Sequence, residues 1–311
     1  MNQKQDINRI LSALSAQDCS QIEIIIRDDS VNDETEVLVK SYTCFKNIIY
    51  FHGKPEGIDN TILFLTKKAK GAYLWWFGDD NFAPTAIKQI LKSIKLHKNL
   101  DFIWANNIRF ESGSLAIAFE KDRYFKSRNE VLLAAWSGLG FISSTILRRD
   151  LALNALSEAS SFIGTDFVNL FIVLHVLANS EYHYYIRGPV VINYPALSAE
   201  IKTITTNRVA GKIVNNAFQV FGLNFMRITK YFKNNFDPAV IYSVNKRNFS
   251  CLWRGIIVGW IGGWDTPSNK RIKMLTNFYM FPEVIPAFIL FCLPKKLNSL
   301  FYSIFQKFRA S

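Results

Sequence analysis

The chain has 311 residues, of which 49% are hydrophobic and 20% charged, so it can bury a sizeable core and is not a disordered protein. Its four cysteines lack CxxC spacing, which argues against both a disulfide framework and a zinc knuckle. The net charge of +12 is uneven, because residues 1–200 hold 21 Lys and Arg against 22 Asp and Glu, and residues 201–311 hold 16 against 3. We therefore expect a near-neutral working domain over 1–195 and a basic, mainly helical segment over 196–311.

Helix and strand patterns alternate through the first hundred residues. Short apolar runs predict three strands, at 22–27, 48–51 and 72–77. Helical spacing, capping residues and a helix-initiating proline predict four helices, over 7–14, from about Glu34, over 58–70 and after Pro84. Strands separated by helices are typical of the α/β class, with a mostly parallel sheet flanked by helices.

Two acidic clusters directly follow predicted strands. The run DDSVND begins at Asp28 after the first strand, and GDDN contains Asp79 and Asp80 after the third. Ligands of open α/β sheets bind at the carboxyl ends of the strands, so both clusters are expected to face one crevice. The first cluster has a structural alternative, because Asp, Ser and Asn favour turns and helix N-caps. The adjacent carboxylates of the second cluster repel each other, and a divalent cation or sugar hydroxyls would offset that repulsion.

These runs, together with GIDN at 57–60, resemble the nucleotide-sugar-binding half of family 2 glycosyltransferases, which have the Rossmann-like GT-A fold. The form WWFGDD is most similar to the abequosyltransferases. The resemblance implies transfer of a hexosyl or deoxyhexosyl unit from a nucleotide-diphosphate donor to a hydroxyl of a glycan or polyprenyl-linked acceptor. It further implies a place in surface polysaccharide synthesis, either O-antigen (lipopolysaccharide) or capsule. The alternative is a catalytically silent relative that only binds or scaffolds at a membrane.

The resemblance also implies roles for individual residues. Asp28 is expected to contact the nucleobase, Asp79 to approach the ribose and Asn60 to reach the nucleotide. Asp80 is expected to bind the Mg²⁺ or Mn²⁺ that bridges the diphosphate and offsets its charge as the glycosidic bond breaks. Many relatives carry a third Asp where this chain has Asn81, and this departure bears on metal affinity.

An inverting transferase also needs a base that deprotonates the acceptor hydroxyl. Asp166 is the candidate, because the sequence places it at the start of a long apolar helix on the expected acceptor side. The alternative is structural, since an Asp in a first helical turn interacts favourably with the helix dipole wherever it occurs. Three further acids are fallback candidates for the base: Glu120, Asp122 and Asp150.

The last forty residues are apolar and basic. Glu283 and two prolines interrupt the apolar stretch 277–294, which is thereby shorter than the ~20 residues that a spanning helix needs. Residues 295–309 place Leu and Phe at helical spacing between basic ends, a pattern typical of an interfacial amphipathic helix. We expect peripheral attachment to an anionic membrane surface, with packing onto the catalytic domain as the alternative. No nucleic-acid-binding motif accompanies the charge, so nucleic acid is not an expected partner.

The chain opens with the polar run MNQKQDINRI, which lacks the apolar core of a secretory signal and favours the cytoplasmic face of the membrane. Relatives that it resembles begin with an apolar strand, and here Asn2 and Gln3 resemble the end of the turn that follows this strand. Without it, the strand at 22–27 would have an unpaired edge. We therefore expect the natural protein to start upstream of Met1, and the chain as written to bind nucleotide poorly.

Overall fold

The computed structural model describes residues 4–30, 32–116, 119–193 and 222–248. The chain divides into two compact units, Met1–Leu197 with Asn234–Phe236, and Ser198–Lys233 with Asp237–Ser311. Every candidate site residue lies in the first unit. The expected division of the chain between 195 and 196 stays a prediction.

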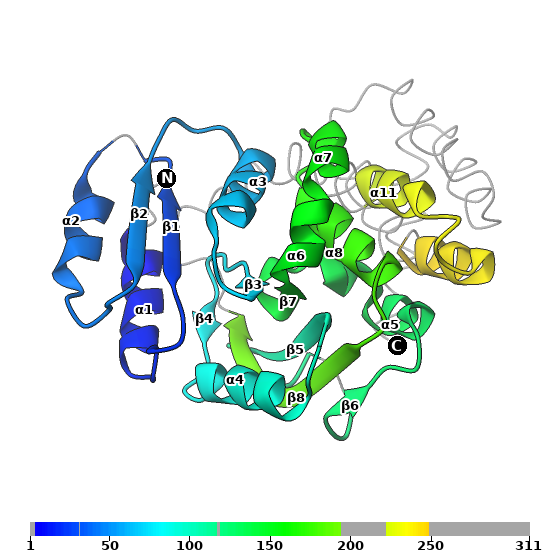
Figure 1. Ribbon diagram of the computed structural model, residues 1–311, viewed down its shortest axis with the longest axis horizontal. Helices are drawn as coiled ribbons and strands as arrows, with labels where there is room; N and C mark the ends of the chain where they lie inside the picture. The colour runs from blue at the N-terminus through cyan, green and yellow to red at the C-terminus, as the bar shows by residue number, and fades with distance from the viewer. Residues whose placement is uncertain (1–3, 31, 117–118, 194–221, 249–311) are drawn as a thin grey trace, which may run out of the picture. The chain divides into compact units, whose positions relative to one another are not determined.

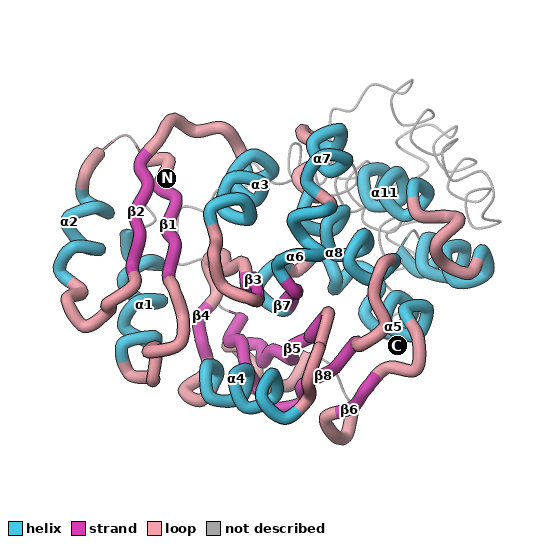
Figure 2. Tube along the Cα trace, viewed as in Figure 1, coloured by secondary structure: helices cyan, strands magenta, loops and turns pink. Residues whose placement is uncertain are grey.

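Helices and strands alternate along the first unit (Figures 1 and 2). The strands are β1 (Ile24–Asp28), β2 (Ile48–His52), β3 (Tyr73–Trp75), β4 (Asn81–Phe82), β5 (Phe102–Arg109), β6 (Arg123–Tyr124), β7 (Thr145–Arg148) and β8 (His183–Asn193). The α-helices are α1 (Lys4–Ser15), α2 (Glu34–Ser41), α3 (Ile58–Lys68), α4 (Ala86–Leu96), α5 (Arg128–Ala135), α6 (Arg149–Asn154), α7 (Leu156–Ala159) and α8 (Val168–Ala178). Three short 3-10 helices are η1 (Trp136–Gly140), η2 (Ile142–Ser144) and η3 (Ser160–Phe162), and the second unit contains α11 (Phe225–Tyr231).

All the helices and strands expected in the first hundred residues are present. α2 begins at Glu34, and the helix after Pro84 is α4. The strand expected at 72–77 is shorter, because only Tyr73–Trp75 pair with β7. The acid pair therefore lies in the short connection between the end of β3 and the start of β4 at Asn81.

The strands form two sheets. One is the parallel pair β1–β2, and the other has the order β3-β7-β5-β8-β4, with β6 paired to β8. The α/β fold with flanking helices is confirmed, but the larger sheet is mixed: β5 and β8 run parallel, whereas its other pairs are antiparallel. The first hundred residues could not indicate this, because β7 and β8 enter the middle of the sheet from later in the chain.

β1 and β3 each lie at the end of their sheet. Among the described strands, β1 pairs only with β2, and β3 pairs only with β7. The Glu23 carboxylate links the starts of these strands, because its Oε1 accepts hydrogen bonds from the backbone N–H groups of Lys70 and Gly71 at 2.5 and 2.6 Å. A strand upstream of Met1 would pair at such an edge, and its existence stays a prediction.

The core of the larger sheet is apolar on both strand faces. Phe102, Ile103 and Leu147 are fully buried. α8 is apolar all round and almost wholly buried, as expected of a helix that lies inside a domain. This packing fixes the strand ends that carry the polar residues of the candidate site.

The part of the second unit that the structure describes is short. Within all the described ranges, no helix is both long enough and apolar enough to cross a bilayer. The stretches 277–294 and 295–309, which are expected to contact a membrane, lie outside the described residues.

Leu147→Ala tests the core. Leu147 is 0% exposed in the central strand β7, so its truncation should lower the free energy of unfolding by about 2–5 kcal/mol. The same substitution at Leu96, which is 63% exposed at the end of α4, should change it by less than about 0.5 kcal/mol. Urea unfolding of both variants provides the measurement. Equal losses of unfolding free energy would contradict the burial of Leu147 and the exposure of Leu96.

Candidate active site

The aromatic run before the acid pair anchors the end of β3. Trp75 Nε1 donates to the Ser143 carbonyl oxygen at 2.8 Å, and Trp76 Nε1 donates to Thr66 Oγ1 at 3.1 Å. The Gly78 N–H donates to Ser143 Oγ at 3.3 Å. The two indoles thus serve packing and positioning, and they fix the turn that presents Asp79 and Asp80.

Asp80 is the most enclosed acid of the pair, with 2% of its surface exposed. Ser143 Oγ donates to its Oδ2 at 2.5 Å, and Asn193 Nδ2 donates to its Oδ1 at 2.9 Å. Burial raises its pKa to about 6, and the neighbouring Asp79 acts in the same direction, against the hydrogen bonds from Ser143 and Asn193. A positive charge bound beside this carboxylate would relieve the cost of burying it.

Asp79 is exposed at the same turn. Its carbonyl oxygen accepts a hydrogen bond from the Arg9 guanidinium of α1, and Arg9 pairs with Asp6 at 3.0 Å. α1 therefore contributes a cationic side chain to the turn that holds the acid pair.

Asp28 ends β1 and organises the turn that follows. Its Oδ1 accepts from the Ser30 N–H at 2.9 Å, and its Oδ2 accepts from Ser30 Oγ at 2.8 Å and the Tyr50 hydroxyl at 2.6 Å. Burial raises its pKa, but hydrogen bonds from Tyr50 and Ser30 outweigh burial and hold the pKa below the ordinary value. Asp28 therefore stabilises a turn, as the structural alternative for this cluster expected. The lowered pKa leaves its carboxylate ionised at neutral pH. No hydrogen bond or ion pair among the described residues joins Asp28 to Asp79 or Asp80.

Asn60 lies in the first turn of α3. Its Nδ2 donates to the Glu56 carbonyl oxygen at 2.8 Å. Its neighbour Asp59, which the sequence did not single out, is 4% exposed and accepts hydrogen bonds from three backbone N–H groups within 164–168. Asp59 thereby ties α3 to the start of α8.

Asp166 lies two residues before the start of α8, close to the position expected for it, and not in the first helical turn that the structural alternative requires. The helix begins at Val168 after Phe167, and Asp166 has a left-handed backbone with φ of 56°. Its carboxylate is exposed and has no hydrogen-bond partner among the described residues. Partial burial, followed by the charge of Asp59, raises its pKa above the ordinary value, which suits a proton acceptor.

The fallback acids differ from Asp166 in their contacts. Asp122 Oδ1 accepts from the Arg187 N–H at 2.7 Å, and Asp150 Oδ1 accepts from Arg148 Nε and the Leu151 N–H, both at 2.8 Å. Glu120 is exposed. Of these acids, Asp122 and Asp150 already hold local structure.

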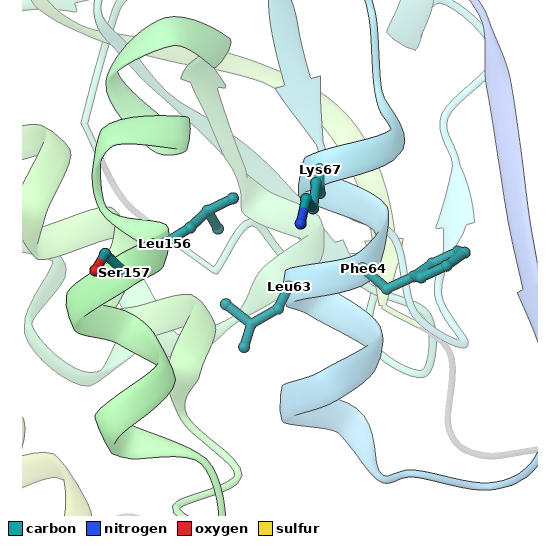
Figure 3. Close-up of a pocket in the computed structure, with 5 residues that line it drawn as sticks. All are labelled: Leu63, Phe64, Lys67, Leu156 and Ser157. Carbon is teal, nitrogen blue, oxygen red and sulfur yellow. The ribbon is translucent and has the colours of Figure 1, made fainter.

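A groove of about 420 Å³ lies between α3 and α7. Leu63 and Leu156 face one another across it (Figure 3). The remaining lining residues are Phe64, Lys67 and Ser157. None of the predicted site residues lines this groove, so the candidate donor site lies at the strand ends and not here.

The donor chemistry of the acid pair suits a hard divalent cation. Asp79 and Asp80 offer carboxylate oxygens, the ligands that Mg²⁺ and Mn²⁺ prefer, whereas the side-chain oxygen of Asn81 accepts from the Phe82 N–H at 3.0 Å. The described residues contain no group of three or more His, Cys, Asp or Glu placed to hold a metal. The two carboxylates therefore fit a cation that takes its other ligands from a bound diphosphate or water.

The family model described as Glycosyl transferase family 2 matches residues 1–152. This range contains the acid pair, Asp28 and the helix α3. The matched residues resemble a glycosyl transferase family 2 domain and make up just under half of the chain. This match supports the predicted class of enzyme, a glycosyltransferase. No curated protein sequence matches the chain.

Solved glycosyltransferase structures share the fold of this chain. TarS 1-349 of S. aureus in complex with UDP-GlcNAc aligns with a TM-score of 0.60 at 13% identity, over 82% of this chain and 75% of that chain. TarS 1-349 without a named ligand gives 0.52 at 14% identity, over 80% and 86%. The mannosyltransferase PcManGT of Pyrobaculum calidifontis, in complex with GDP-Man and Mn²⁺, gives 0.50 at 11% identity, over 98% and 85%. The expected GT-A-like fold is confirmed.

Three contacts of the acid pair were not predicted from the sequence. Ser143, Asn193 and Arg9 reach the turn from η2, β8 and α1. Ser143 and Arg9 lie 63 and 70 residues away along the chain from the residues they contact. No local spacing connects such positions, and only the tertiary packing of α1, η2 and β8 brings them together.

The raised pKa of Asp80 predicts a pH-dependent stability. Because the folded pKa of about 6 exceeds the ordinary value of 3.8, the folded state binds more protons than the unfolded state between these values. The stability that the protonated Asp80 side chain contributes is therefore fully present below about pH 4. This stability is lost as the pH rises through the folded pKa of about 6. Without metal, the wild type should lose on the order of 2–3 kcal/mol relative to Asp80→Asn between about pH 4 and pH 7.

Urea unfolding in EDTA across this pH range measures that difference. Glu181→Gln, at an exposed acid before β8, is the control and should follow the wild type. Parallel stability curves for the wild type and Asp80→Asn would contradict the effect assigned to burial.

Proposed function

We propose that this family 2 domain transfers a sugar from a nucleotide-diphosphate donor to a hydroxyl of a glycan or polyprenyl-linked acceptor in bacterial surface polysaccharide synthesis, either O-antigen or capsule. The observation that carries the proposal is the acid pair at the end of β3, in which Asp80 is buried and fixed by Ser143 and Asn193. The nucleotide sugars bound in TarS and PcManGT support this class of donor.

The proposed donor contacts come from two strand ends. Asp28, held ionised by Tyr50 and Ser30, accepts hydrogen bonds from the nucleobase, and the exposed Asp79 reaches the ribose hydroxyls. The side-chain N–H₂ group of Asn60 already donates to the Glu56 carbonyl oxygen just before α3, so this group is not available to the nucleotide. The side-chain carbonyl oxygen of Asn60 remains the group that would accept from the nucleotide.

Asp80 is the proposed ligand of Mg²⁺ or Mn²⁺. A bound cation would neutralise charge on the departing diphosphate, and it would offset the desolvation that raises the pKa of Asp80. The Mn²⁺ in the PcManGT complex supports this choice of ion. Ser143 and Asn193 orient the carboxylate that would bind the ion.

Asp166 is the proposed base of an inverting transfer. The acceptor oxygen forms a bond to the anomeric carbon, the bond from that carbon to the diphosphate breaks, and the hydroxyl proton passes to the Asp166 carboxylate. The nucleoside diphosphate leaves with the bonding electron pair. An exposed carboxylate with a raised pKa can accept that proton.

Asp80→Ala tests the donor site. Purified protein is screened against nucleotide sugars, including UDP-GlcNAc and GDP-Man, and release of the nucleoside diphosphate is scored with and without Mg²⁺ or Mn²⁺. The variant should lose metal-dependent nucleotide binding and turnover together, by at least about 100-fold in kcat/KM. Glu181→Ala, which removes an exposed acid remote from the strand ends that carry the site, should keep both.

Two results would separate the rival functions. Full metal-stimulated transfer by Asp80→Ala would show that the metal assignment is wrong. Nucleotide binding by the wild type without release of diphosphate from any donor would favour the silent, scaffolding relative.

The proposed location is the inner face of the cell membrane, with peripheral attachment through the basic C-terminal segment. Each Lys or Arg near an anionic leaflet contributes about 1 kcal/mol, and apolar side chains add to this. Replacing Phe301, Phe305 and Phe308 by Ser in the full chain should reduce flotation with anionic liposomes. High salt should weaken flotation of the wild type, and equal flotation of both proteins would contradict the attachment.

A further inference from the structure

We propose that Asp59 is a positioning residue that fixes the backbone of Asp166 and so aims the base at the acceptor hydroxyl. The inference rests on the proposed role of Asp166. It connects α3, within the matched range 1–152, to a turn that lies outside that range.

Three hydrogen bonds carry the inference. Asp59 Oδ2 accepts from the backbone N–H groups of Gly164 and Asp166 at 2.8 and 2.9 Å, and its Oδ1 accepts from the Val168 N–H at 3.0 Å. Both carboxylate oxygens are used, and the side chain is 4% exposed. An ionised carboxylate has only acceptor sites, so it matches three converging donors without leaving a buried N–H unpaired.

These bonds remove a competing role for Asp166. The first N–H groups of a helix need acceptors, and an Asp near the helix start commonly supplies one. In α8, the residue before the helix is Phe167, whose side chain makes no capping hydrogen bond, and Asp59 accepts from Val168 in its place. The Asp166 carboxylate is therefore not used to cap the helix and faces solvent.

The same bonds stabilise a strained turn. Gly164 and Asp166 both have left-handed backbones, with φ of 87° and 56°. A non-glycine residue adopts this conformation only when its surroundings hold it there. Because Asp59 binds the N–H groups of both residues, it holds the backbone from which the Asp166 side chain projects.

Asp59→Asn tests the inference with little change in volume. The amide keeps one acceptor oxygen and turns an N–H₂ group toward a backbone donor, so at least one of the three bonds is lost. Asp101→Asn is the matched control, because Asp101 is also buried and its Oδ2 accepts from the Glu181 and Tyr182 N–H groups, both at 3.0 Å. Both variants should lose stability. A fall in kcat in Asp59→Asn alone would then report the positioning of Asp166 and not a general loss of stability.

Kinetics and hydrogen exchange provide the readouts. Asp59→Asn should lower kcat by about 10- to 100-fold and leave donor Kd unchanged, whereas Asp101→Asn should keep kcat. Amide exchange in 164–168 should accelerate in Asp59→Asn alone. In an Asp166→Asn background, which itself slows transfer by about 100-fold or more, Asp59→Asn should add little further loss.

The outcomes distinguish the inference from the proposed function. Normal transfer by Asp166→Asn would show that another residue is the base, and the positioning role would fall with it. Slow transfer by Asp166→Asn with normal kcat in Asp59→Asn would overturn the positioning role alone. Unchanged exchange in 164–168 would also overturn it, independently of any activity.

Discussion

The site depends on one buried interaction, the carboxylate of Asp80 held by Ser143 and Asn193. A carboxylate with 2% exposure is costly to bury unless donors surround it, so the fold must bring η2 and the end of β8 to the turn after β3. β7, which follows η2 directly, pairs with β3, and the strand order β3-β7-β5-β8 then sets where β8 ends. Sheet pairing and the chemistry of the acid pair are therefore parts of one constraint.

Buried carboxylates have the same function elsewhere in the unit. Asp59 joins α3 to the turn before α8, and Asp101 joins the start of β5 to the backbone before β8. In both cases the acceptor oxygens of one side chain meet N–H groups from about 80 to 109 residues away. Such links fix loops that hydrophobic contact alone would leave free to move.

Local sequence was sufficient for much of the first hundred residues. α2 and α4 follow from starts near Glu34 and Pro84, and α3 follows from the helix expected over 58–70. β1 and β2 follow from runs of β-branched and aromatic residues. A binding role for the acid pair after β3 was predicted because two adjacent carboxylates behind a buried strand need a partner, and this role stays a prediction. The mixed sheet was missed, since strand direction in the middle of a sheet depends on where later segments insert.

The sequence by itself determined the α/β class and the acids at the strand ends, and it indicated a resemblance to family 2 glycosyltransferases, because these are properties of short contiguous runs. Only the tertiary structure decided how those acids are used. It gave Asp80 its two donors, assigned the capping of α8 to Asp59, and left the Asp166 carboxylate exposed. The physical reason is that a carboxylate's burial, pKa and hydrogen-bond donors are set by segments distant along the chain, which the spacing of residues around it does not encode.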